Sequence, residues 1–158
     1  MDIISHGLWG SVAFDRKNKK SFWTAFLIGI APDIISFGPF FAGILLGFYP
    51  TPDFRAGPPP TAIIPEYINS IYNITHSLII FALVFFIAWL ILKKPYLPLF
   101  AWGLHVFMDI FTHSYEFFPT PFIWPISTYK FNGTNWGEPI IFIPNILLLA
   151  ILYGWFFY

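Results

Sequence analysis

Four histidines lie in short polar segments of an otherwise apolar chain: His6, His76, His105 and His113. Each has a serine, threonine or aspartate beside it or one helical turn away. Ionisable groups are costly in apolar surroundings unless a partner or a metal ion compensates them. Neutral imidazoles and carboxylates are standard ligands of divalent metal ions. We therefore expect the chemistry of this protein to take place at these segments.

The most informative spacing is His105-x-x-x-Asp109. Residues four apart on a helix project from one face, so the imidazole and the carboxylate can bind the same ion. The alternative is a hydrogen-bonded structural pair, which is the commoner use of this spacing in soluble helices. Within a membrane, and with two further histidines at a similar depth, the spacing favours a metal site.

His113 lies eight residues after His105, which corresponds to about 12 Å along a helix axis. Ligands of one ion must each lie within ~2.1 Å of it, so these two histidines cannot share an ion with Asp109. Either Asp109 bridges two ions ~3.5–4 Å apart, or His113 is an accessory group that faces the substrate. We favour the accessory role. An interfacial histidine with no function is the simpler alternative.

Asp33 follows Pro32, which predicts a helix break. Freed backbone groups and a carboxylate would together form a polar pocket at membrane depth, whereas the simpler interpretation is a cap for the next helical piece. Considered singly, His6 and His76 are equally well explained by interhelical hydrogen bonds. Considered together with His105 and Asp109, they favour a metal site.

The composition is that of an integral membrane protein. Hydrophobic residues make up 57% of the 158 positions and charged residues only 10%, whereas soluble domains have roughly 25% charged residues. The net charge of zero disfavours binding of nucleic acid. The absence of cysteine leaves nitrogen and oxygen as metal ligands.

The apolar segments predict an all-α fold, an integral membrane bundle of four to five transmembrane helices forming a single domain over residues 1–158. Pro32-Asp33 is expected to end one helix, and residues 34–48 either complete a broken span or re-enter the membrane. Exposed loops are expected at about 49–73 and 114–139. The predicted helical segments are Ile3–Phe14, Phe22–Ala31, Ile34–Phe48, Ile74–Leu92, Leu97–Thr112 and Ile140–Tyr158.

Basic residues predict the orientation. Six of the eight fall in two short loops, which the positive-inside rule places in the cytoplasm: Arg16, Lys17, Lys19, Lys20, Lys93 and Lys94. Counting helical rise from these loops gives depths of about 15 Å for His6, 20 Å for Asp33, 26 Å for His76, 16 Å for His105 and 22 Å for Asp109. All five depths fall in the outer half of a core ~30 Å thick, so we expect one site that opens to the outer face.

The polar segments, in their order along the chain, resemble a known family. They are Ser5-His6-Gly7, Ala31-Pro32-Asp33, Thr75-His76-Ser77, Gly103-Leu104-His105-x-x-x-Asp109-x-x-Thr112 and the turn at Pro125. Together they are similar to the membrane-bound metal-dependent hydrolases, also described as LexA-binding, inner-membrane-associated hydrolases. The resemblance implies a helical bundle in the cytoplasmic (inner) membrane, a divalent metal and a poorly defined substrate. One departure is Ile34-Ile35, where many members would have a second aspartate or a histidine.

The sequence therefore predicts a membrane-embedded hydrolase that uses a divalent ion, zinc above others, to activate water. His6, His76, His105 and Asp109 would hold the ion, and Asp33 would be a further ligand or the general base. His113 or Glu116 would protonate the leaving group. The depth of the site suggests a lipid ester or phosphoester as substrate, and membrane lipids as partners.

Three non-enzymatic functions remain open on the sequence. Two histidines on facing helices can ligate haem iron in an electron carrier. Intramembrane histidines and aspartates can also line an ion or proton path in a transporter, although that function favours ionisable groups through the whole membrane thickness. The third is a structural subunit in which the histidines bond neighbouring helices.

Overall fold

The computed structural model describes residues 1–14, 18–52 and 64–157. These residues form helices joined by turns, with no β-strand among them. The all-helical prediction is confirmed. The helices are α1 (Ile3–Ala13), α2 (Lys19–Leu45), α3 (Glu66–Thr75), α4 (Leu78–Leu92), the 3-10 helix η2 (Leu97–Leu99), α5 (Phe100–Thr112) and α6 (Pro139–Phe157).

Two of these helices, α2 and α6, are long and apolar enough to cross a membrane. Helices α3 and α4 form a third candidate span, bent by 54° where they meet. Helix α5 is apolar but shorter, and α1 has 11 residues. By length and composition the described residues thus provide two or three candidate spans, where the sequence predicted four to five.

Helix α2 continues through Pro32, so the predicted break at Pro32-Asp33 is wrong. A proline removes one backbone hydrogen bond, and the carbonyls freed around it can find other donors. Ser36 Oγ donates to the Pro32 carbonyl at 2.8 Å, and His105 Nδ1 lies 2.7 Å from the Gly29 carbonyl in the preceding turn. Side chains thus contact the backbone on both sides of the proline, and residues 34–45 extend the same helix.

The break occurs instead at His76–Ser77, inside the segment Ile74–Leu92 that the sequence predicts as one span. Ser77 caps α4, because its Oγ accepts hydrogen bonds from the backbone N–H groups of Ile79 at 3.1 Å and Ile80 at 3.2 Å. Helix α3 precedes the break and occupies residues that the sequence placed in the loop 49–73. Residues 53–63 of that loop lie outside the described residues.

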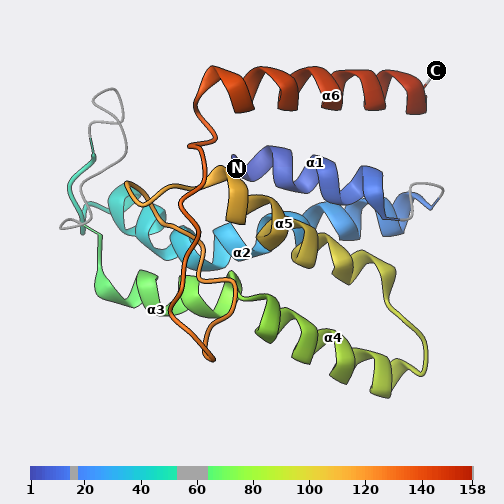
Figure 1. The fold of residues 1–158 in the computed structure, drawn as a ribbon, viewed down its shortest axis with the longest axis horizontal. Coiled ribbons are helices and arrows are strands. Elements are labelled where there is room, and N and C mark those ends of the chain that lie inside the picture. The colour runs from blue at the N-terminus through green and yellow to red at the C-terminus, as the bar shows by residue number, and fades with distance from the viewer. Residues whose placement is uncertain (15–17, 53–63, 158) are drawn as a thin grey trace.

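Helices α1, α2 and α5 pack together at the centre of the fold, with α3 against α2, α4 against α5 and α6 against α1 (Figure 1). Small residues allow α1 and α2 to approach closely. A Cβ atom added at Gly29 would lie 2.7 Å from the His6 carbonyl oxygen and 3.2 Å from the Gly7 Cα atom. Ala25 and Gly29 have the small-xxx-small spacing typical of tight helix contacts in membranes.

The described lysines of both basic loops lie at the same end of the fold. Lys19 and Lys20 begin α2, while Lys93 and Lys94 follow α4, and these helix ends lie on one side of Figure 1. Arg16 and Lys17 lie outside the described residues. The grouping of the two loops agrees with the arrangement that the positive-inside rule requires.

Candidate metal centre

Four side chains come together at the middle of the fold, and all four are buried. Asp33 comes from α2, His76 from the break between α3 and α4, and His105 and Asp109 from α5. One ligand atom from each lies within 4.8 Å of the others. The sequence predicted that these four residues would meet, and the structure brings them together.

The distances between the ligand atoms fit a single ion. His105 Nε2 lies 3.1 Å from both His76 Nε2 and Asp109 Oδ2, and 3.8 Å from Asp33 Oδ1. His76 Nε2 lies 3.4 Å from Asp33 Oδ1 and 3.6 Å from Asp109 Oδ2. Two ligands ~2.1 Å from a tetrahedral ion lie about 3.4 Å apart. The five distances between ligand atoms are therefore close to the distance expected between two ligands of one tetrahedral ion.

Hydrogen bonds on the far side of the imidazoles orient them towards this centre. A carbonyl only accepts, so the contact of His105 Nδ1 with the Gly29 carbonyl places the proton on Nδ1 and leaves a lone pair on Nε2. His76 Nδ1 has a hydroxyl partner, Thr75 Oγ1, at 2.9 Å. Both histidines thus have the outer hydrogen bond that metal-ligating imidazoles commonly make.

Aromatic stacking fixes the same rings from the side. The Tyr72 ring stacks on His76 with centroids 3.7 Å apart, and the His6 ring stacks on His105 with centroids 3.6 Å apart. Trp102 Nε1 donates to the Thr75 carbonyl at 2.6 Å, which ties α5 to the end of α3. The two imidazoles are therefore held by packing as well as by hydrogen bonds.

His6 does not belong to the group of four, although the sequence placed it among the ligands. It is fully buried, and its Nε2 lies 2.9 Å from Asp109 Oδ1, the other oxygen of that carboxylate. His113 also contacts this oxygen, with Nε2 3.4 Å away. The amino group of Met1 contacts Asp109 Oδ1 and lies 3.1 Å from His113 Nε2. Both carboxylate oxygens of Asp109 thus have polar groups close to them.

Glu116, the second candidate proton donor, is not brought to the centre. It is exposed in the turn between Ser114 and Phe117. Within the described part of the chain, the cavity beside the cluster is lined without it. The turn reverses the chain directly after α5 and directs Glu116 outwards, whereas His113 stays buried against Asp109.

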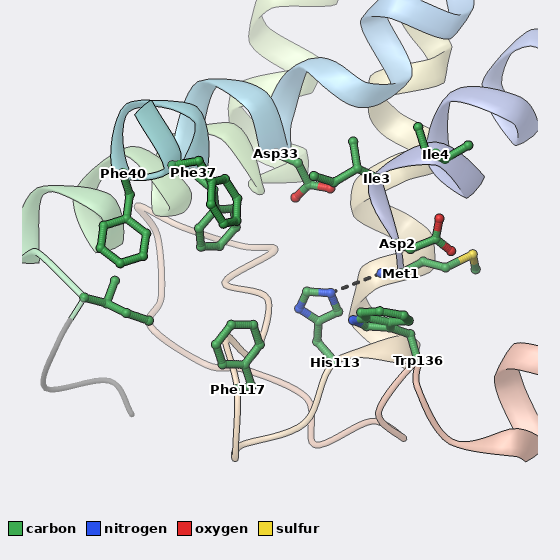
Figure 2. Close-up of a pocket in the computed structure, with 12 residues that line it drawn as sticks. Met1, Asp2, Ile3, Ile4, Asp33, Phe37, Phe40, His113, Phe117 and Trp136 are labelled. Carbon is green, nitrogen blue, oxygen red and sulfur yellow. Dashed lines mark hydrogen bonds between the residues drawn. The ribbon is translucent and has the colours of Figure 1, made fainter. Parts of the chain in front are cut away.

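A cavity of about 370 Å³ adjoins the cluster. Asp33 and His113 point into it from opposite sides, from α2 and from the residue after α5 (Figure 2). Most of its remaining wall is apolar: Ile3, Phe37, Phe40, Phe41, Ile64, Phe117 and Trp136. The volume lies in the usual range for small-molecule sites, roughly 300–1,000 Å³.

Sequence reasoning missed Tyr72 and Gly29. Tyr72 lies four residues before His76 and so shares its helix face, a signal that the prediction of a loop over 49–73 concealed. Gly29 is four residues after Ala25, and this spacing of small residues could have indicated the close contact between α1 and α2.

Fold and site together define a class: an all-helical protein with two or three candidate membrane spans around a buried histidine and aspartate cluster that can bind a metal ion. No protein-family model, curated protein or solved structure matches the chain.

Proposed function

We propose that the protein is a membrane-embedded, metal-dependent hydrolase. The observation that carries this proposal is the buried group Asp33, His76, His105 and Asp109, with one ligand atom from each within 4.8 Å of the others, beside an apolar cavity. Neither the buried group nor the cavity alone would suffice, because buried histidines also serve as structural residues. Their combination provides a place for an ion and a place for a substrate.

The residues fit a divalent ion. Asp33 and Asp109 are both buried, and two carboxylates at such short range repel one another unless a cation lies between them. Asp109 Oδ2 is buried with no hydrogen-bond partner among the described residues. Two imidazole nitrogens and two carboxylate oxygens form a donor set that suits zinc.

A divalent ion bound there would lower the pKa of a water molecule to near ~7 and polarise the substrate. Asp33 contributes to the cluster and also lines the cavity, so it is placed to accept a proton from that water. The water oxygen bonds to the carbonyl carbon or phosphorus, and the bond to the leaving oxygen breaks. Asp33 then returns the proton to the leaving oxygen, so that the products are an acid and an alcohol.

The cavity suggests the kind of substrate. Its walls are mainly phenylalanine and isoleucine, which suit an alkyl or isoprenoid chain, while Asp33 and His113 mark its polar end. An amphiphile would bind with its apolar part among the phenylalanines and its ester or phosphoester at the cluster. Membrane lipids and lipid-like molecules have this chemistry.

The geometry supports the other functions less well. The two axial nitrogens of a haem iron lie about 4 Å apart on opposite faces of a wide macrocycle. His76 Nε2 and His105 Nε2 lie only 3.1 Å apart. A proton or ion path favours ionisable groups along the whole membrane thickness, whereas those buried in the described helices gather at one level.

Metal analysis of detergent-purified protein tests the proposal. We expect stoichiometric metal in the native protein and background levels in the double variant His105→Ala, Asp109→Ala. A panel of lipid esters and phosphoesters in mixed micelles should be hydrolysed by the metal-loaded native protein, and not after chelation. Substoichiometric metal in the native protein, or equal metal in both proteins, would contradict the mechanism.

The variant Asp33→Asn separates binding from catalysis. An amide keeps the shape and one oxygen ligand, but it is a much weaker base than a carboxylate. We expect most of the metal to be retained and the rate of hydrolysis to fall by about 10²-fold or more. Tyr153→Phe, on α6 and away from the cluster, is the matched control and should leave the rate unchanged.

A further inference from the structure

The two oxygens of Asp109 face two different pairs of histidines. Oδ2 lies 3.1 Å from His105 Nε2 and 3.6 Å from His76 Nε2. Oδ1 lies 2.9 Å from His6 Nε2 and 3.4 Å from His113 Nε2. A carboxylate with a pair of imidazole nitrogens at each oxygen has the arrangement of a bridging ligand between two ions.

In the part of the chain that the structure describes, His6 has no hydrogen-bond partner on the Oδ1 side of Asp109. The side chain is fully buried, and neither ring nitrogen has a hydrogen-bond partner among the described residues. Nε2 approaches Asp109 Oδ1 without the geometry of a hydrogen bond, while stacking on His105 holds the ring in place. A buried polar atom without a partner is destabilising, and an ion at Nε2 would remove this penalty.

His113 has the outer hydrogen bond of a metal ligand. Its Nδ1 lies 2.8 Å from the carbonyl oxygen of Phe118, which can only accept, so the proton is on Nδ1. The lone pair of Nε2 then points to the region of Asp109 Oδ1. The hydroxyl of Tyr72 donates to the same carbonyl at 2.9 Å and helps to fix it.

We propose that a second divalent ion binds between His6 Nε2, His113 Nε2 and Asp109 Oδ1, with Asp109 bridging it to the ion of the group of four. This inference rests on the proposed metal centre and extends it to a pair of ions. The amino group of Met1 lies at this position, in contact with Asp109 Oδ1. It also lies 3.1 Å from His113 Nε2, as Figure 2 shows. An ion bound here would displace this amino group from Asp109 Oδ1 and His113 Nε2.

A second ion also narrows the substrate class. Two divalent ions among four neutral histidines and two carboxylates leave a net positive charge at the end of the cavity. An anionic group is stabilised there more than a neutral one. Paired ions are typical of enzymes that act on phosphoesters, where they stabilise the attacking and the leaving oxygen. The substrate is accordingly a phosphoester with an apolar chain rather than a neutral carboxylic ester.

Metal counting at saturating Zn²⁺, followed by removal of free metal, tests the second site. We expect two ions per chain in the native protein and one in each of His6→Gln and His113→Gln. Tyr153→Phe is the control, because it removes a hydroxyl on α6 that contacts no member of the cluster, and it should keep two ions. Circular dichroism and gel filtration identify any variant that fails to fold.

A measurement on the native protein makes the test independent of the variants. Loaded with Mn²⁺ alone, a bridged pair gives the exchange-coupled electron paramagnetic resonance spectrum of two neighbouring ions. One ion per chain with an uncoupled six-line spectrum would overturn the second site and leave the proposed hydrolase centre intact. A native protein that binds no ion would overturn both proposals.

Discussion

The central and the peripheral helices of this protein bury different kinds of side chain. Helices α1, α2 and α5 bury histidine, aspartate, serine and glycine. Every residue of α4 is exposed or half-buried, and the buried residues of α6 are Asn145 and Leu149. In lipid, apolar side chains gain nothing by packing away from the solvent, whereas polar ones do. The polar interior thus helps to hold this bundle together, and it also contains the group that could bind a metal ion.

The segments that supply the cluster include irregular backbone. The ligands come from a helix that contains a proline near its middle, from the break between α3 and α4, and from the short helix α5. The last helix, α6, supplies no member of the cluster and packs against α1. Irregular backbone at membrane depth is tolerated where neighbouring groups satisfy it, and such places are suited to binding sites.

The contact between α1 and α2 should be the most sensitive part of the centre. In Gly29→Leu, the new Cβ would meet the His6 carbonyl, which is backbone and cannot move aside without shifting α1. We expect a loss of about 3 kcal/mol or more in the free energy of unfolding, together with loss of bound metal. Thermal unfolding in detergent and metal analysis measure both.

Gly154→Leu on α6 is the peripheral counterpart, because a Cβ there meets nothing within 4 Å. It should leave the free energy of unfolding and the amount of bound metal unchanged. Equal effects of the two substitutions would contradict the distinction between centre and periphery.

Removing the hydroxyl of the central Tyr72 should weaken metal binding, whereas removing that of the peripheral Tyr153 should not. Tyr72→Phe removes the hydroxyl that bonds the Phe118 carbonyl and lies 3.2 Å from His113 Nδ1. Loss of such an outer partner weakens metal binding by about 10-fold to 100-fold, which competition with a chelator can measure. Tyr153→Phe loses bonds to Ser11 and the Leu8 carbonyl, far from the cluster, and should bind metal like the native protein.

Asn145 is the polar exception on α6, and it tests what attaches this helix. Its Oδ1 accepts from Trp9 Nε1 at 2.7 Å, and its Nδ2 donates to Ser5 Oγ at 2.8 Å. Asn145→Leu should reduce stability by about 0.6–1.7 kcal/mol, as interhelical hydrogen bonds in membranes do, without changing metal content. Unchanged stability would mean that apolar packing and the bonds of Tyr153 to α1 are enough to hold α6.

The smallest effect is expected on the outer face of α4. Ile91 is 72% exposed, and in a membrane its surroundings are lipid in both the folded and the unfolded helix. Ile91→Ala should therefore change the free energy of unfolding by less than about 0.5 kcal/mol. A larger loss would identify this face of α4 as a contact surface rather than a lipid-facing one.

Much of the site could be predicted because helical geometry determines it. The spacing of His105 and Asp109 places both on one face, and counting helical rise brought Asp33 and His76 to the same level. The distribution of histidines between the two oxygens of Asp109 could not be predicted, because it depends on side-chain rotation and helix packing. For this reason the depth argument grouped His6 with the ligands of a single ion, whereas it lies at the other oxygen of Asp109.

The errors in the fold have a common cause. Pro32 predicts a helix end, yet α2 continues through it, with a bond from Ser36 of the same helix to the Pro32 carbonyl and a contact from His105 of α5 to the Gly29 carbonyl. The real break, at His76–Ser77, depends on a serine cap inside an apolar run that otherwise favours an unbroken helix. In both cases a side-chain hydrogen bond outweighed the local preference of the backbone.

The wide separation of the ligands along the chain has a consequence for biogenesis. The cluster draws on α2, on the break before α4 and on α5, and Asp109 also contacts His6 at the start of α1. The proposed coordination sphere therefore does not exist until helices α1 to α5 have been synthesised and lie side by side. If these helices are inserted in a membrane, each carboxylate would until then remain protonated or hydrated. Capture of the ion would accordingly be a late, committing step of assembly, and supply of metal during insertion would determine how much of the chain matures.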